Sequence, residues 1–262
     1  MRKVLLVGNW KMHLNVSQAS LLVHRLHERT RIHRDLEIVL APTMLALQPL
    51  SMQIDRRKFR LAAQNAYPAD EGPYTGEVSF TMLRDLVHYV IVGHSERRKF
   101  FHDDLPMVRD KVKAAVRNEI SPILCVGETQ HERREGLTKR VLHDQVTTAL
   151  QNLTAREVMN VVIAYEPVWA ISTFQGEYAR PDDVAECMRY IRHQVSQLYG
   201  EHVGKAIRVI YGGSVDGSTV RGYLEIEECD GALVGHESIN PYHFAAIIEA
   251  AYRLQMSQEN ET

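Results

Sequence analysis

The chain has 262 residues, of which 45% are hydrophobic and 24% are charged. These are ordinary values for a globular protein, so they exclude a disordered chain, a collagen-like repeat and a small disulfide-stapled scaffold. The 31 basic and 33 acidic residues give a net charge of −2, so the chain as a whole has no long-range attraction for nucleic acid or for an anionic membrane.

Short apolar runs alternate with amphipathic stretches along the whole chain. The runs are rich in Val, Ile and Leu, as expected for parallel strands that are covered on both faces. We predict strands over Val4–Val7, Leu36–Leu40, Arg60–Ala63, Tyr89–Val92, Pro122–Val126, Val161–Ala164, Arg208–Tyr211 and Ala232–Val234. We predict helices over Ser17–Glu28, Met44–Ile54, Ser79–Asp85, Leu105–Asn118, Arg140–Leu150, Pro181–Leu198, Ser218–Leu224 and Pro241–Leu254. Ser17 and Asn240 stand where helix N-caps are expected, and Pro181 and Pro241 suit a first helical turn.

Eight strand–helix units follow one another with no linker and no shift in composition. This order predicts a single α/β domain over residues 1–262 with the architecture of a closed (β/α)8 barrel. An open, doubly wound sheet is the alternative. Its common G-x-G-x-x-G fingerprint is missing after the first strand, so we favour the barrel.

The cysteines and the start of the chain bear on the cellular compartment. Cys125, Cys187 and Cys229 are widely spaced and form no CxxC pair, which leaves neither a zinc knuckle nor a thioredoxin motif and predicts reduced thiols. The apolar run that opens the chain ends at Gly8, too early for a secretory signal or a membrane span. We therefore expect a soluble, cytoplasmic protein.

In a (β/α)8 barrel, functional groups gather where strands end and loops begin. Polar or glycine-rich residues follow five of the predicted strands: Asn9 and Lys11; His94, Ser95 and Glu96; Glu166; Gly213 and Ser214; Gly235 and His236. Each has an ordinary structural explanation when taken alone, because lysines are usually solvated and residues such as His94 can cap a helix. Together they place a base, a neutral acid, a cation and two anion sites on one face, which favours a functional site.

This set suits proton transfer next to a carbonyl group on a small phosphorylated substrate. The backbone N–H groups of 213–214 and 235–236 could hold a phosphate, since glycine permits close approach. Glu166 could take a proton from carbon, and Lys11 could stabilise the developing oxyanion. A helix N-terminus disfavours the cationic form of His94, which could then polarise the carbonyl as a neutral donor. The sequence shows no cluster of metal ligands, so we expect protein groups alone to hold the enolate, without a metal.

Several longer motifs give the chain a specific resemblance. They are GNWKM at 8–12, AQNA at 63–66, YTGEVS at 74–79, GHSERR at 93–98, ILCVGE at 123–128, AYEPVWAI at 164–171, YGGSV at 211–215 and DGALVG at 230–235. In this order they resemble the signatures of the triosephosphate isomerase family over nearly the whole chain. The resemblance implies a TIM barrel that interconverts dihydroxyacetone phosphate and D-glyceraldehyde 3-phosphate through an enediolate, in glycolysis and gluconeogenesis, without a cofactor.

The same resemblance implies roles for the polar residues. Glu166 is then the base that moves a proton between C1 and C2, and His94 is the neutral electrophile at the two oxygens. Lys11 supplies positive charge. Glu96 pairs with Lys11 in the open form, and Ser95 contacts the base.

The implied binding residues lie on four loops. Asn9 helps to orient the substrate together with Lys11. The phosphate is implied to meet the backbone at Ser172, Gly213, Ser214, Gly235 and His236. The partners expected are therefore a phosphosugar substrate and neither nucleic acid nor membrane.

The segment 65–79 is long for a loop of this kind and contains two prolines and two glycines. Without the resemblance it would be taken for a solvated surface excursion. With it, the segment is expected to reach into a second copy of the chain in a homodimer, with Thr75 approaching that copy's Lys11 and His94. Arg97 is expected to brace the same interface.

Two segments depart from the family pattern. The lid segment (residues 172–180) reads Ser172, Thr173 and Phe174 where the family has Gly-Thr-Gly, and it is longer than usual. His236 and Glu237 stand where the family usually has Gly and Ala. If position 236 needs a positive φ, a histidine there is strained by about 1 kcal/mol or more.

These departures leave two alternatives to a triose phosphate isomerase. One is an isomerase of a related ketose phosphate, such as a tetrulose phosphate, for which a longer lid would make room. The other is a non-catalytic homologue that binds phosphosugars. Because the proton-transfer residues are all present, we predict that triose phosphate is the best substrate.

Overall fold

Eight parallel strands close into a barrel in the computed structural model, which describes residues 3–173 and 178–260. The strands are β1 (Val4–Asn9), β2 (Leu36–Ala41), β3 (Phe59–Ala63), β4 (Tyr89–Val92), β5 (Ser121–Val126), β6 (Val162–Tyr165), β7 (Arg208–Tyr211) and β8 (Gly231–Val234). Each pairs with the next in chain order, and β1 also pairs with β8, with Leu5 opposite Gly231. The predicted closed barrel is thus confirmed, and the open sheet is excluded.

The alternation of side chains along each strand builds two separate cores. In β1, Leu5 and Val7 point into the barrel, where they meet Val39, Ile123 and other small or branched side chains from the remaining strands. Their chain neighbours face the surrounding helices and belong to a second, larger core. A strand buried on both faces must be apolar at nearly every position, and this explains the runs of Val, Ile and Leu in the sequence.

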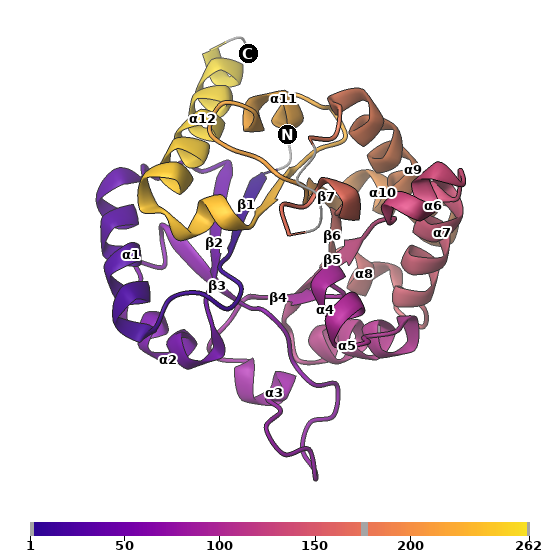
Figure 1. Ribbon diagram of the computed structural model, residues 1–262, viewed down its shortest axis with the longest axis horizontal. Coiled ribbons are helices and arrows are strands. Elements are labelled where there is room, and N and C mark those ends of the chain that lie inside the picture. The colour runs from indigo at the N-terminus through magenta and orange to yellow at the C-terminus, as the bar shows by residue number, and fades with distance from the viewer. Residues whose placement is uncertain (1–2, 174–177, 261–262) are drawn as a thin grey trace.

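Helices surround the barrel on its outer side, as Figure 1 shows. The eight predicted helices are all present as α1 (Val16–Arg29), α2 (Met44–Gln53), α3 (Phe80–Leu83), α5 (Leu105–Arg117), α7 (Thr138–Ala149), α9 (Pro181–Tyr199), α11 (Val220–Leu224) and α12 (Pro241–Asn260). Four short helices were not predicted: α4 (Ser95–Phe100), α6 (Gln130–Arg134), α8 (Ala155–Val158) and α10 (Glu201–Ala206). Each is too short for a helical hydrophobic period to be visible in the sequence.

The start of α1 corrects one prediction. Ser17 is not the N-cap, because the helix begins at Val16 and is capped by Asn15. The Asn15 side chain accepts from the Gln18 N–H at 3.0 Å, and the Gln18 side chain accepts from the Asn15 N–H at 3.0 Å. This reciprocal capping box satisfies two N–H groups, which Ser17 could not do from inside the first turn. At α12 the predicted cap is confirmed, since Asn240 accepts from two backbone N–H groups in the first turn.

The segment between β3 and α3 projects away from the barrel, at the bottom of Figure 1. It folds back on itself: the Tyr67 N–H donates to the Val78 carbonyl at 2.8 Å, and the rings of Tyr67 and Tyr74 lie 4.3 Å apart. Within the described ranges, no helix is both long enough and apolar enough to cross a membrane.

Candidate active site

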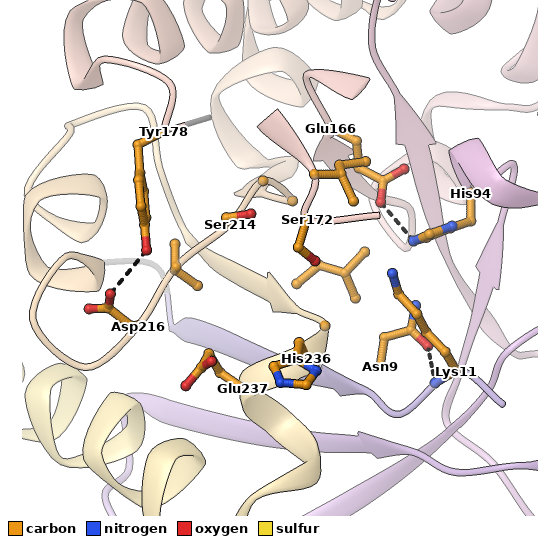
Figure 2. A pocket seen from close by; sticks show the side chains of 16 residues that line it. Asn9, Lys11, His94, Glu166, Ser172, Tyr178, Ser214, Asp216, His236 and Glu237 are labelled. Atoms are coloured by element: carbon orange, nitrogen blue, oxygen red, sulfur yellow. Dashed lines mark hydrogen bonds and ion pairs between the residues drawn. The ribbon is translucent and has the colours of Figure 1, made fainter. Parts of the chain in front are cut away.

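A cavity of about 200 Å³ opens at the carboxyl ends of the strands. It is lined by nine of the residues singled out from the sequence: Asn9, Lys11, His94, Glu166, Ser172, Gly213, Ser214, Gly235 and His236. Figure 2 shows Glu166, His94, Asn9 and Lys11 near one another at one end of the cavity. We call this the chemical end, and we call the part around Ser172 and His236 the phosphate end, after the roles that the family resemblance implies for these residues.

Glu166 follows β6 and is 2% exposed. One carboxylate oxygen lies 3.0 Å from His94 Nε2, and the other accepts from the Ser95 N–H at 3.2 Å. The segment directly after β7 leaves room for this side chain because residue 212 is glycine: a Cβ atom at Gly212 would lie 2.5 Å from the Glu166 Cγ. The base predicted from the sequence is therefore buried and aimed at the imidazole.

His94 ends the loop after β4 and caps α4. Its Nδ1 accepts from the Glu96 N–H at 3.3 Å. A neutral imidazole whose Nδ1 accepts must carry its proton on Nε2, and Nε2 is the atom that faces Glu166. The helix N-terminus thus selects the tautomer that can donate a hydrogen bond into the cavity.

Lys11 has a left-handed backbone with φ of 51°, which is unfavourable for a residue with a side chain and costs of order 1 kcal/mol. Two hydrogen bonds hold the Lys11 backbone there, and a third anchors the Gln64 side chain that supplies one of them. The Lys11 N–H donates to Asn9 Oδ1 at 3.1 Å, and Gln64 Nε2 donates to the Lys11 carbonyl at 2.8 Å and to the Ala41 carbonyl at 2.9 Å. The strained turn directs the ammonium group back into the cavity.

The Lys11 ammonium group forms a triangle with Glu96 and Thr173. Its Nζ lies 2.6 Å from Glu96 Oε1 and 3.0 Å from Thr173 Oγ1, and the Thr173 hydroxyl donates to the same carboxylate oxygen at 2.8 Å. Burial works to raise the pKa of Glu96, but the hydrogen bond from Lys11, the charge of Lys11 and the hydrogen bond from Thr173 lower it, and the overall shift is downward. Glu96 is therefore the anion that pairs with Lys11.

The phosphate end is lined by Gly213, Ser214 and Gly235 and also by two carboxylates, those of Asp216 and Glu237. Ser172 and His236 are exposed there. His236 begins the short 3-10 helix η2 (His236–Ile239) and does not have a positive φ, so the strain considered for this position does not arise. The Ser214 N–H donates to the Ala170 carbonyl at 3.0 Å, so an anion would reach this donor only after that bond opens.

Comparison with known proteins agrees with this arrangement. A family model described as triosephosphate isomerase matches residues 4–251. Two curated relatives are named triosephosphate isomerase. The protein from Chloroherpeton thalassium is 42% identical over 96% of this chain and all of its own length. The protein from Dictyoglomus turgidum is 39% identical over 95% of this chain and all of its own length. The chain belongs to the triosephosphate isomerase family. The predicted family and its isomerase class are therefore confirmed.

The segment that leads from β6 into the lid is anchored by a buried carboxylate. Glu128 is fully buried and accepts from Trp169 Nε1 at 3.0 Å and from the Tyr165 hydroxyl at 3.2 Å. The guanidinium group of Arg133 lies over the Trp169 ring, 4.4 Å from its centroid. Trp169 belongs to the 3-10 helix η1 (Val168–Ala170), so these contacts fix the chain directly after Glu166.

The departures from the pattern of the triosephosphate isomerase family lie partly outside the described residues. Phe174 and residues 175–177 of the lid segment are outside them. Tyr178 is described, and its hydroxyl donates to Asp216 Oδ2 at 3.2 Å. Glu237 also has an interaction partner, since its carboxylate lies 2.8 Å from His243 Nδ1.

Four contacting residues were given no role from the sequence: Gln64, Thr173, Tyr178 and Asp216. Gln64 stands in the AQNA motif at 63–66, so a signal was present, but its two backbone contacts depend on the left-handed turn at Lys11. The contacts of Thr173, Tyr178 and Asp216 join loops that are far apart in the chain. Nothing in their local sequence reveals such contacts.

The two residues expected at a dimer interface lie away from the cavity. Thr75 is exposed on the projecting segment. Arg97 lies on α4 and donates from Nε to Asp103 Oδ2 at 2.8 Å within the same chain. Asp103 also accepts from the buried Lys111 at 2.6 Å, so Arg97 belongs to an ion cluster whose other two members are buried.

Proposed function

We propose that this chain interconverts dihydroxyacetone phosphate and D-glyceraldehyde 3-phosphate by proton transfer through an enediolate, as a cytoplasmic enzyme of glycolysis and gluconeogenesis. The observation that carries the proposal is the 3.0 Å contact between Glu166 and His94 Nε2. A buried carboxylate base and a neutral hydrogen-bond donor face one site, which is what enolisation of a carbonyl compound needs. The reaction uses no metal and no cofactor.

In the proposed forward step, the Glu166 carboxylate takes a proton from C1 of dihydroxyacetone phosphate. The electron pair of that C–H bond forms the C1–C2 double bond, and the carbonyl oxygen becomes the enediolate oxygen. His94 Nε2–H donates a hydrogen bond to this oxygen, and Lys11 offsets its charge. Return of the proton from Glu166 to C2 gives the aldehyde product, with the hydroxyl proton of C1 transferred to the C2 oxygen.

Substrate binding must first separate groups that contact one another in the ligand-free chain. Glu166 accepts from both His94 and the Ser95 N–H, and Lys11 is bound to Glu96 and Thr173. We propose that the substrate oxygens replace these partners at His94 and Lys11, with Asn9 orienting the substrate. The released carboxylate of Glu166 then faces carbon.

The phosphate group is proposed to bind at the end of the cavity remote from Glu166. The proposed donors are the backbone N–H groups of Ser172, Gly213, Ser214, Gly235 and His236. Amide groups hold a dianion without placing a fixed cation next to it. Binding at Ser214 also requires its N–H to leave the Ala170 carbonyl.

We further propose a homodimer. Exposed apolar side chains on α2, α3 and α4 and on the segments that follow β1, β3 and α4 support it: Met12, Met44, Leu45, Tyr74, Met82, Phe100 and Phe101. Exposed apolar area of this kind is typical of an interface between copies of a chain. In this dimer Thr75 of one copy approaches Lys11 and His94 of the other, and Arg97 braces the interface. Sedimentation of the purified chain at micromolar concentration tests it.

A coupled assay with triose phosphates and tetrulose phosphates tests the proposed reaction. We expect a higher kcat/KM with triose phosphate, because the four residues that the proposed proton transfer uses, Asn9, Lys11, His94 and Glu166, are all present and line one cavity. A higher kcat/KM with the tetrulose would assign the related ketose phosphate instead. Absence of turnover with either, together with binding of both, would indicate a non-catalytic binding protein.

A further inference from the structure

The phosphate end of the cavity carries two carboxylates that the proposed reaction does not use. Asp216 and Glu237 both line the cavity, and in Figure 2 they lie on the far side from Glu166, with Asp216 beyond Ser214. Among the described residues that line the cavity, Lys11 is the only lysine or arginine, and it belongs to the chemical end. A phosphate group bound at the phosphate end would therefore have the carboxylates of Asp216 and Glu237 on its outer side, away from the sugar carbons of the substrate.

Asp216 is held in place by its own turn. Its Oδ1 accepts from the N–H groups of Ser218 and Thr219 at 2.8 and 2.9 Å, and from the Ser218 hydroxyl at 2.6 Å. The hydrogen bonds from Ser218 and Thr219 outweigh the effect of burial and lower the pKa of Asp216 to about 2. The carboxylate is therefore charged and oriented at neutral pH, and its second oxygen remains for Tyr178.

The Tyr178 side chain contacts the Asp216 carboxylate and does not belong to either hydrophobic core. The residue is 55% exposed, it lines the cavity, and its hydroxyl donates to Asp216 Oδ2 at 3.2 Å. Burial and the Asp216 carboxylate raise the pKa of Tyr178, so the phenol stays a neutral donor. The next residue, Ala179, is buried and its carbonyl accepts from the Tyr223 hydroxyl at 2.7 Å. The backbone beside Tyr178 is thus fixed.

Glu237 adds the second negative charge. Its carboxylate contacts His243 Nδ1 at 2.8 Å and is 28% exposed. Its charge also contributes to the raised pKa of Tyr178, which places the three side chains within electrostatic reach of one another. We call Tyr178, Asp216 and Glu237 the anionic wall.

We infer that the anionic wall restricts the cavity to ligands that end in a single phosphoryl group and rejects those that carry a second phosphoryl group beyond the first. The inference rests on the proposed function in one respect, namely that the phosphate lies between Ser172 and Ser214. A second phosphoryl group would bring its charge against Asp216 and Glu237 and its oxygens against the Tyr178 ring. Like charges a few ångströms apart in a partly hydrated site repel strongly enough to change affinity several-fold.

The test compares binding of glycerol 3-phosphate and glycerol 3-diphosphate by calorimetry. Neither ligand has a carbonyl group, so neither can be isomerised. We expect the wild-type chain to bind the monophosphate at least about tenfold more tightly. Asp216→Asn keeps an oxygen for Ser218 and Thr219 but removes the charge, and it should narrow this preference about threefold or more. Tyr178→Ala should narrow it further than Tyr178→Phe, because only the former removes the ring.

Glu249→Gln is the matched control, since it removes one negative charge from an exposed ion pair with Arg253 on α12. It should leave the preference unchanged. Equal binding of the two ligands by the wild-type chain, an equal narrowing in the control, or binding of neither ligand would overturn the inference. The binding test needs no turnover. A chain that prefers the monophosphate but shows no isomerase activity would therefore overturn the proposed function and still support the inference about the anionic wall.

Discussion

At the chemical end of the cavity, Glu166 and His94 are buried and contact each other through their side chains, whereas at the phosphate end Ser172 and His236 are exposed and offer backbone groups. The contact at the chemical end depends on residue type, because only a glutamate at position 166 and a histidine at position 94 bring a carboxylate and an imidazole together at this distance. The arrangement at the phosphate end depends on the path of the backbone. Sequence departures from the family can therefore accumulate at the phosphate end while the chemical end keeps its residues.

The largest loss of activity is expected from Glu166→Asp at the chemical end. The substitution keeps the charge but withdraws the carboxylate by one methylene group from its position beside His94. We expect kcat in the coupled triose phosphate assay to fall by roughly 10²–10⁴-fold, as for a displaced general base. An unchanged rate would remove Glu166 from the role of base. A melting temperature near that of wild type shows that the loss is not due to unfolding.

Glu96→Gln tests the charge that positions Lys11. The amide keeps the shape but loses the ion pair with Nζ, which lies 2.6 Å away. We expect kcat to fall by about 10- to 100-fold, because a loosened ammonium group misses the developing oxyanion. A wild-type rate would show that Glu96 is dispensable for placing Lys11.

The same variant has a pH signature. The folded-state pKa of Glu96 is lowered from 4.5, so its charge stabilises the fold fully above the unfolded pKa, and this contribution disappears as the pH falls through the folded value. Wild type should therefore lose stability more steeply than Glu96→Gln below about pH 4.5. Urea unfolding between neutral and acid pH measures the two slopes, and parallel slopes would contradict the assignment.

Gln64→Leu tests the support beneath the chemical end. It removes the two donors that bind the carbonyls of Lys11 and Ala41. We expect a loss of about 1–3 kcal/mol in the free energy of unfolding, because buried carbonyls lose partners and the left-handed turn at Lys11 loses its restraint. Gln53→Leu is the matched control, since that side chain donates to a backbone carbonyl at an exposed site. Equal losses in the two variants would show that Gln64 has no special part.

The smallest effect is expected from His236→Ala at the phosphate end. The backbone N–H remains, and the backbone does not have the positive φ that would disfavour either residue. We expect KM for triose phosphate to change by no more than about threefold, as is usual for an exposed side chain away from buried contacts. A tenfold rise in KM would show that the imidazole itself binds the phosphate, and it would remove the contrast between the two ends.

Much of the fold could be predicted because each strand is buried on both faces and is therefore apolar throughout. The ends of α1 could not be predicted as well, since Asn15 and Ser17 are both good N-caps and only the reciprocal bond with Gln18 decides between them. The short helix α4 was also missed. Its six residues, Ser95–Phe100, carry the polar and charged groups of a motif rather than a hydrophobic period.

In the candidate site, too, some features could be predicted from the sequence and others could not. Glu166, His94 and Lys11 could be placed together because strand ends meet at one rim of the barrel. The contacts of Tyr178 with Asp216 and of Thr173 with Glu96 could not, because they depend on the path of loops 38 and 77 residues apart in sequence. The left-handed turn at Lys11 was hidden for a similar reason: a lysine gives no local sign of positive φ, and the support comes from Gln64, 53 residues away.

The pairing of β1 with β8 has a consequence for how the chain is made. Leu5 lies opposite Gly231, so the sheet cannot close until a ribosome has produced nearly the entire polypeptide. Until then the growing product exposes two unpaired strand borders, which are templates for association with other nascent chains. Removal of the segment from residue 231 onward would make that vulnerable state permanent, and we expect such a truncated chain to collect in insoluble aggregates.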